Sequence, residues 1–172
     1  MPIGSARAVH LFCWMCAIGL LTATGNRGLA AEPVTNTLAV ERVLMDSGQE
    51  RTEPAATAKP GDLLQYEVAF HNNGHTTLHG LNATLPLPPG TEFVAGSQRP
   101  AQPQASVDGT TFEALPLKRI VRRPDGTSGE ELVPLREYRF LRWAAADVAP
   151  NGTLTVSARV IVAGNTGSNP GN

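Results

Sequence analysis

The sequence predicts an all-β protein, an antiparallel β-sandwich of about seven or eight short strands behind a signal peptide. Two observations support this fold class. The 172 residues include 17 Gly and 14 Pro but only 17% charged residues, which suits short strands joined by turns. Alternation of apolar and polar residues recurs along the chain, and no segment after the apolar N-terminal run has the period of a helix.

Residues 1–30 have the pattern of a secretory signal peptide. Arg7 precedes an apolar run over residues 8–21, and small residues close the segment. The run is shorter than the roughly 20 residues that cross a bilayer, so we expect cleavage and no transmembrane segment afterwards, with retention as an anchor as the alternative. Cys13 and Cys16 both lie in this run, where no folded setting stabilises a thiolate. We therefore expect an exported protein, periplasmic or extracellular, without cysteine.

The remaining chain divides into three parts. Residues 31–37 form a polar lead-in, residues 38–163 the sandwich domain, and residues 164–172, which are rich in Gly, Asn and Ser, a disordered tail. The first expected strand, residues 38–45, has apolar residues at both parities, so the pattern does not decide which of its faces is buried. Polar residues 46–58 follow as a loop or a broken edge strand.

The clearest strands lie on both sides of the Asn-Asn-Gly sequence at residues 72–74, a predicted tight turn. Alternate residues from 64 to 70 are apolar, which predicts a half-buried strand. Residues 78–85 form the next strand, and it ends at prolines because they cannot donate ladder hydrogen bonds. Residues 154–162 alternate in the same way and form the last strand.

Several motifs occur in one order along the chain. They are Lys-Pro-Gly-Asp at residues 59–62, Tyr-x-Val-x-Phe-x-Asn-x-Gly at 66–74, Leu-Pro-x-Pro-x-Gly-Thr-x-Phe-Val at 85–94, and Leu-x-Trp followed by Val-Ala-Pro-x-Gly at 141–152. In this order they resemble the bacterial conserved repeat domain family, domain of unknown function eleven, over residues 38–162. The resemblance implies an immunoglobulin-like sandwich in an exported or cell-surface bacterial protein, and it brings no catalytic residues.

Residues 98–135 are less regular and are expected to form an insertion with a hairpin. Residues 111–115 are expected to pair with residues 117–122. An Asp-Gly turn at residues 125–126 then allows residues 118–122 and 132–135 to form an exposed hairpin.

Three histidines, His71, His75 and His79, are spaced four residues apart and are the candidate metal ligands. On a helix they would share one face and suit zinc or copper. The Asn-Asn-Gly sequence between them breaks a helix, and strand parity places His71 on the solvent side but His79 on the core side. We expect polar residues decorating the end of a hairpin, with a metal site or a pH-sensitive contact as alternatives.

Lys118, Arg119, Arg122 and Arg123 form a basic cluster, the candidate surface contact. Glutamates lie close in sequence, so we expect a solvated face of mixed charge. Contact with an anionic envelope component is the alternative. Nucleic-acid binding is not expected, because the formal net charge is -1 and no aromatic residues are interleaved with the arginines.

The sequence has no recognisable catalytic motif. None of its serines lies in a Gly-x-Ser-x-Gly setting, and its carboxylates are scattered. We therefore expect no enzymatic activity and no cofactor, and we expect Trp143 to pack in the core rather than to bind a sugar.

The expected function is that of a non-catalytic cell-envelope module. It would act in protein-protein or surface interaction, with another envelope protein as the partner, through a sheet edge that accepts a strand. The alternative is a β-sandwich module that binds a small ligand, a glycan or a metal.

Overall fold

The structure is a computed structural model, and it describes residues 34–164. Within that range the chain consists of strands, turns and one short 3₁₀ helix, which confirms the predicted all-β fold class. The expected signal peptide at residues 1–30 lies outside the described residues, as does all but the first residue of the tail expected at residues 164–172. Between residues 34 and 164, no helix has the length and apolarity needed to cross a bilayer.

The strands of the described range are β1 (Val34–Asp46), β2 (Gln49–Pro54), β3 (Leu63–Asn72), β4 (Leu78–Pro86), β5 (Thr91–Phe93), β6 (Gln104–Ser106), β7 (Glu113–Ala114), β8 (Lys118–Arg122), β9 (Ser128–Leu132), β10 (Phe140–Val148) and β11 (Thr153–Val162). The 3₁₀ helix η1 (Leu135–Glu137) precedes β10.

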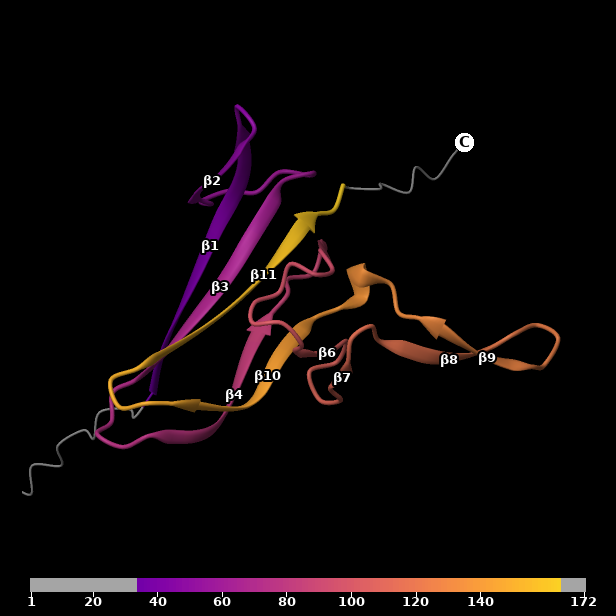
Figure 1. Cartoon of the computed structure of the whole chain (residues 1–172). Coiled ribbons are helices and arrows are strands. Elements are labelled where there is room, and N and C mark those ends of the chain that lie inside the picture. Colours follow the sequence, from indigo (N-terminus) through magenta and orange to yellow (C-terminus); the bar gives the residue numbers. More distant parts are fainter. Residues whose placement is uncertain (1–33, 165–172) are drawn as a thin grey trace, which may run out of the picture. The chain divides into compact units, whose positions relative to one another are not determined.

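Two antiparallel sheets form the sandwich (Figure 1). One has the order β2-β1-β3-β11-β5 and the other the order β4-β10-β6-β7. The sheets of the described residues hold more strands than the seven or eight expected, because β5, β6 and β7 have only two or three residues each. Sequence alternation does not reveal strands this short.

The core lies between the two sheets. Alternate residues of β3 and β11 face inward, as predicted, and meet residues of β4, β6 and β10 from the other sheet. Trp143 is buried among them, and its indole Nε1 donates to the carbonyl oxygen of Pro100 at 2.8 Å. Tyr138 is also buried and stacks on Phe93, with ring centroids 5.8 Å apart. Apolar burial between the sheets therefore stabilises the sandwich.

Strand β1 begins at Val34, four residues before the expected start, so part of the expected lead-in belongs to the sheet. At its other end, a two-residue turn leads into β2. Ser47 and Gly48 both have positive φ, of 52° and 85°. This is the conformation that matches the twist of a tight hairpin. Of the two alternatives for residues 46–58, the edge strand is therefore the one observed.

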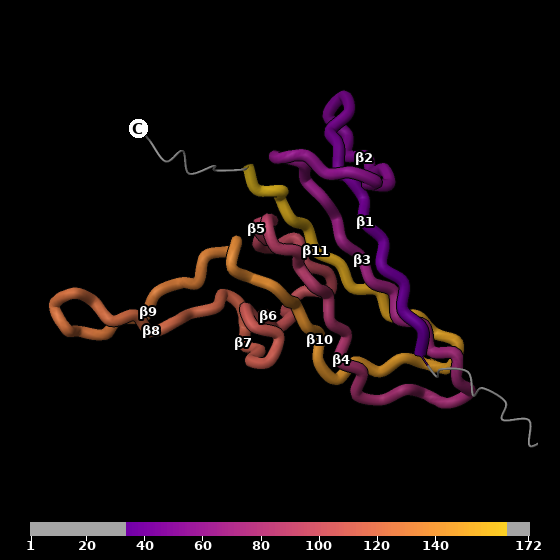
Figure 2. The backbone as a smooth tube through the Cα atoms, turned by 180° about the vertical axis from the view of Figure 1, so that it is seen from behind, coloured from indigo at the N-terminus to yellow at the C-terminus, as the bar shows by residue number. Residues whose placement is uncertain are grey.

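Residues 98–135 contain short strands and one hairpin. We expected residues 111–115 to pair with residues 117–122. This prediction is wrong, because β7 pairs with β6. β8 pairs with β9 instead, so the hairpin forms, but its second strand is residues 128–132 and not residues 132–135 as expected. The hairpin ends at Leu132 because Val133 turns into the core and is buried. Figures 1 and 2 show β8 and β9 leading away from both sheets.

Candidate functional site

The three histidines do not converge. β3 and β4 belong to different sheets, so the segment between them crosses from one sheet to the other and is not the hairpin end that we expected. No residue from 72 to 74 has positive φ. The crossing is held instead by the buried side chain of Asn72, whose Nδ2 donates to the carbonyl oxygens of Thr76, Val148 and Ala149. The predicted tight turn at residues 72–74 is therefore absent, and the histidines lie on or beside a segment that crosses between the sheets.

Each end of the histidine series has its own partner. His71 Nδ1 lies 3.0 Å from Thr153 Oγ1 on the neighbouring strand β11. His79 Nδ1 lies 2.9 Å from Asp147 Oδ2 on β10. Among residues 34–164, no group of three His, Cys, Asp or Glu side chains is placed to hold a metal ion. The arrangement supplies two separate polar contacts and not a ligand set.

The prediction that His79 lies on the core side is wrong, because its side chain is 74% exposed. The register between β4 and β10 shifts in this region, and Gly80 has a φ of +71°. Such an irregularity reverses the alternation along a strand. The hydrogen bond from His79, together with the N–H of Gly80, lowers the pKa of the Asp147 carboxyl.

The basic cluster lies on the β8–β9 hairpin and beside its turn, and it is partly neutralised there. Lys118 Nζ lies 2.7 Å from Glu130 Oε2. Arg119 contacts Glu131 at 3.4 Å and Glu137 of η1 at 2.7 Å. All of these side chains are at least one third exposed. The hairpin therefore has the mixed-charge surface that we expected as the default.

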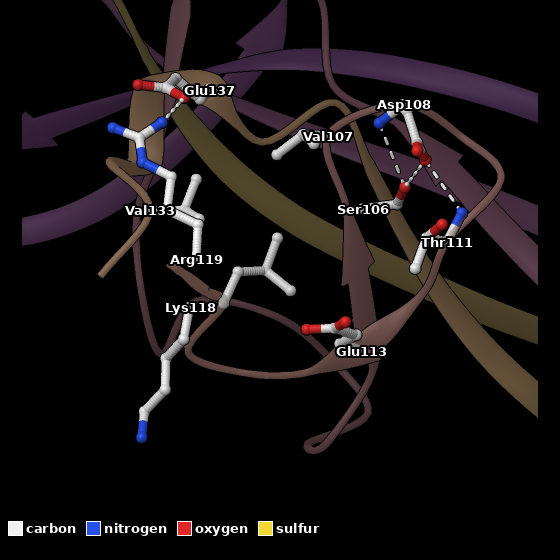
Figure 3. Close-up of a pocket in the computed structure, with 10 residues that line it drawn as sticks. Ser106, Val107, Asp108, Thr111, Glu113, Lys118, Arg119, Val133 and Glu137 are labelled. Atoms are coloured by element: carbon white, nitrogen blue, oxygen red, sulfur yellow. Dashed lines mark hydrogen bonds and ion pairs between the residues drawn. The ribbon is translucent and has the colours of Figure 1, made fainter. Parts of the chain in front are cut away.

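A small hollow lies where the hairpin leaves the sandwich (Figure 3). Its volume is about 160 Å³. Leu117 and Val133 contribute buried apolar surface, and the half-exposed side chain of Val107 also lines it. Arg119 and Glu137 form an ion pair on its wall. The hollow thus combines apolar surface with charged groups of both signs, since Asp108 and Glu113 also line it.

The hydroxyl and carboxylate beside the hollow hold a loop together. Ser106 is fully buried, and its Oγ donates to Asp108 Oδ1 at 2.9 Å while accepting the N–H of Gly109. Asp108 also accepts the N–H groups of Thr110 and Thr111. These hydrogen bonds hold the pKa of the Asp108 carboxyl well below its usual range. The carboxylate is therefore a weak base, and its role is to fix the loop.

The other candidate surface is the edge of β1 at residues 34–39, called here the open edge because no second strand within residues 34–164 pairs with it. β2 pairs with β1 only from Glu41 to Asp46, and on its other side β1 pairs with β3. Ala55 N–H donates to the carbonyl oxygen of Val40, so the main-chain groups of Val40 point toward the β2 side. Groups of the same residue parity point the same way in a strand. The N–H and C=O groups of Val34, Asn36 and Leu38 therefore point outward from the sheet.

The open edge is uncharged and partly apolar. Residues 34–39 read Val-Thr-Asn-Thr-Leu-Ala, without charge or proline. Leu38 lies opposite Val68, a core residue, so its side chain is on the sandwich-facing side of the sheet, yet it is 51% exposed. Of the described strands, the facing edge strand β4 packs over β3 and β11, and residues 35–39 of β1 are exposed within the part of the chain that the structure describes. An uncharged strand edge of this kind is a template for pairing with another chain.

Sequence reasoning missed this edge because residues 34–37 were placed in a polar lead-in. The sequence does show an uncharged segment there that contains Val34, Thr35 and Thr37, which favour strands, but the length of β2 decides which part of β1 has no second neighbour. Comparisons with protein-family models, with curated proteins and with solved structures find no match. The resemblance to the conserved repeat domain family stays a prediction.

Proposed function

We propose that the protein is a non-catalytic, exported cell-envelope module that binds another protein by pairing strands at the open edge of β1. The observation that carries this proposal is the outward orientation of the main-chain groups at Val34, Asn36 and Leu38 along an uncharged strand. Strand addition uses such groups for affinity, and it uses alternate side chains for specificity.

The side chain of Leu38 adds an apolar contact to this edge. It is about half exposed on the sandwich-facing side of the sheet, beyond the reach of β4. A strand laid along residues 34–39 would cover it and remove apolar surface from water. Both the main chain and the side chains of this segment therefore favour an added strand.

The binding test removes one outward N–H group. Asn36→Pro deletes a donor that faces away from β3, and proline is tolerated at such edge positions. Asn36→Ala is the matched control, because it removes the same side chain and keeps the N–H. Immobilised parent and Asn36→Ala proteins should capture the same partner from envelope extract, and Asn36→Pro should lose it. Equal capture by all three proteins contradicts the proposal.

Export is tested separately by fractionation. Deleting residues 1–30 should leave the protein in the cytoplasm, whereas the full-length protein should reach the envelope or the medium. Unchanged export of the deleted form would contradict this part of the proposal.

Small-ligand binding is the second candidate, and the hollow beside Arg119 favours it. Benzoate is a suitable probe because it joins an apolar ring to a carboxylate that can compete with Glu131 and Glu137 for the Arg119 guanidinium. NMR titration should shift the amide signals of Val107 and Leu117 in the parent protein and not in Arg119→Gln. Unchanged spectra at millimolar benzoate would remove this candidate for anions of that kind.

A further inference from the structure

We propose that the open edge of β1 pairs with the same edge of a second copy of this chain, joining the two five-stranded sheets across a two-fold axis. This inference rests on the proposed function, because it names the partner of that edge. Two antiparallel strands related by a two-fold axis present the same surface to one another, so an edge that fits itself closes a dimer.

The main-chain parity fits such a dimer. Val34, Asn36 and Leu38 direct their N–H and C=O groups outward, whereas Thr35 and Thr37 direct theirs toward β3. With the axis at Thr37, Asn36 of one copy lies opposite Leu38 of the second copy as a hydrogen-bonded pair. Thr37 then meets Thr37 of the second copy as a non-hydrogen-bonded pair, a favourable cross-strand combination.

Side chains support the same register. On the sandwich-facing side, Leu38 of one copy becomes the diagonal neighbour of Leu38 of the second copy, within reach of long side chains. Each of these leucines is 51% exposed in the single chain. Pairing therefore covers the exposed apolar residue of the edge with its own equivalent.

The open edge of β1 has no charged residues, unlike several other unpaired strand edges within residues 34–164. Self-pairing of β8 would oppose lysine and arginine residues, and self-pairing of β9 would bring Glu130 and Glu131 against their copies. The outer edge of β2 carries charges of both signs at Glu50, Arg51 and Glu53 and ends at Pro54, and charged side chains and proline are features that discourage edge pairing. Like charges opposite one another destabilise a strand pair. Residues 34–39 oppose no charges when they pair with themselves.

Geometry disfavours the remaining edges. β4 has a register shift and a positive-φ glycine at Gly80, and it ends at Pro86. Bulges and prolines are devices that block edge pairing. β5 and β7 are only three and two residues long. Within residues 34–164, the edge of β1 is therefore the best suited to a second copy.

A charge-exchange experiment tests the dimer. The Asn36→Lys/Leu38→Lys and Asn36→Glu/Leu38→Glu variants of the full-length chain each place like charges opposite one another, and a mixture of the two places opposite charges together. Sedimentation equilibrium should give twice the monomer mass for the parent and for the mixture, and the monomer mass for each variant alone. Circular dichroism checks that every variant is folded.

Cross-linking tests the position of the axis. In the proposed register the two Thr37 Cα atoms lie about 4.5 Å apart, within the roughly 4.4–6.8 Å range that a disulfide spans. Thr37→Cys should give a covalent dimer under mild oxidation. Thr155→Cys is the matched control, since Thr155 lies on the exposed side of the central strand β11. Both variants carry the same background from Cys13 and Cys16.

The outcomes separate this inference from the proposed function. A parent protein that stays monomeric up to millimolar concentration, with no excess cross-linking at Thr37→Cys, overturns the dimer. If such a monomer still captures a different protein in a manner abolished by Asn36→Pro, the edge accepts a foreign strand and only the second copy is excluded. If it is monomeric and captures nothing, both proposals fail.

Discussion

The sandwich and the β8–β9 hairpin are built from the same kind of strand, but different interactions hold them. The strands β3, β10 and β11 of the sandwich bury one face against the opposite sheet. The hairpin has both faces in water, with Ile120 and Leu132 exposed at 71% and 58%, and ion pairs on its surface. A two-stranded ribbon is marginally stable by itself. Its attachment to the sandwich must therefore supply much of its order.

That attachment is a short set of contacts at the base of the hairpin. Leu117 and Val133 are buried in the main core, and Val133 N–H donates to the carbonyl oxygen of Leu117 at 2.9 Å. The N–H of Leu117 in turn donates to the Tyr138 hydroxyl at 2.8 Å. The strands β8 and β9 therefore keep their conformation with little burial, because the residues at the base of the hairpin are fixed in the core.

The largest effect is expected from truncation in the sandwich. Leu141→Ala removes a side chain that is fully buried between the sheets, and it should lower the free energy of unfolding by about 2–5 kcal/mol. Ile120→Ala, on the exposed hairpin, should change it by less than about 0.5 kcal/mol. Urea unfolding of both variants checks the contrast, and equal losses would show that the hairpin belongs to the cooperative core.

A smaller loss is expected where the two regions join. Tyr138→Phe keeps the ring stack on Phe93 but leaves the buried N–H of Leu117 without its acceptor. The expected cost is about 1–3 kcal/mol. Hydrogen exchange should also accelerate in β8 and β9. Tyr66→Phe serves as the control, because Tyr66 lies in β3, away from the base of the hairpin, and a matching loss there would contradict the proposed role of the Tyr138 hydroxyl.

Acid should weaken the loop beside that junction. The folded-state pKa of Asp108 lies below the unfolded value of 3.8, so its ionised form stabilises the fold at neutral pH. This contribution is complete above about pH 5 and is lost as the pH falls below the unfolded value toward the folded one. The difference in melting temperature between the parent and Asp108→Asn should therefore shrink from about pH 5 to about pH 2. Glu92→Gln, at an exposed position of β5, provides the matched carboxylate control.

The smallest effect is expected on the hairpin surface. Glu130→Gln removes the ion pair with Lys118, whose two side chains are more than half exposed. The loss should be about 0.2–1 kcal/mol at low salt, and it should vanish near 1 M salt because exposed charges are screened. Hydrogen exchange in β8 and β9 measures it locally. A larger, salt-independent loss would mean that the pair contributes more than surface charge.

The parts of the fold that the sequence predicts correctly are those governed by local alternation. Val68 of β3 and Val156 of β11 are buried as their parity indicates, because both strands are central in their sheet and bury one face. The orientation of His79 was predicted wrongly because the irregular register of β4 reverses it. The alternation of apolar and polar residues in a sequence does not reveal a shift in strand register.

The candidate site was harder to predict, for a different reason. An open edge depends on which strands are neighbours, and residues 34–39 are open because β2 is shorter than β1. The contact between Leu117 and Tyr138 likewise joins residues that no local pattern relates. The identity and composition of a strand are encoded locally, whereas the pairing that leaves it exposed is a property of the assembled sheets.

The burial of Trp143 also makes the assembly of the two sheets optically visible. Its indole lies in the core with its N–H bonded to Pro100, and the second tryptophan of the sequence, Trp14, lies in the segment expected to be cleaved. In a chain lacking residues 1–30, all indole fluorescence arises from the interface between the sheets. The emission should shift to longer wavelength when water enters that interface, so the protein carries its own reporter of folding without an added label.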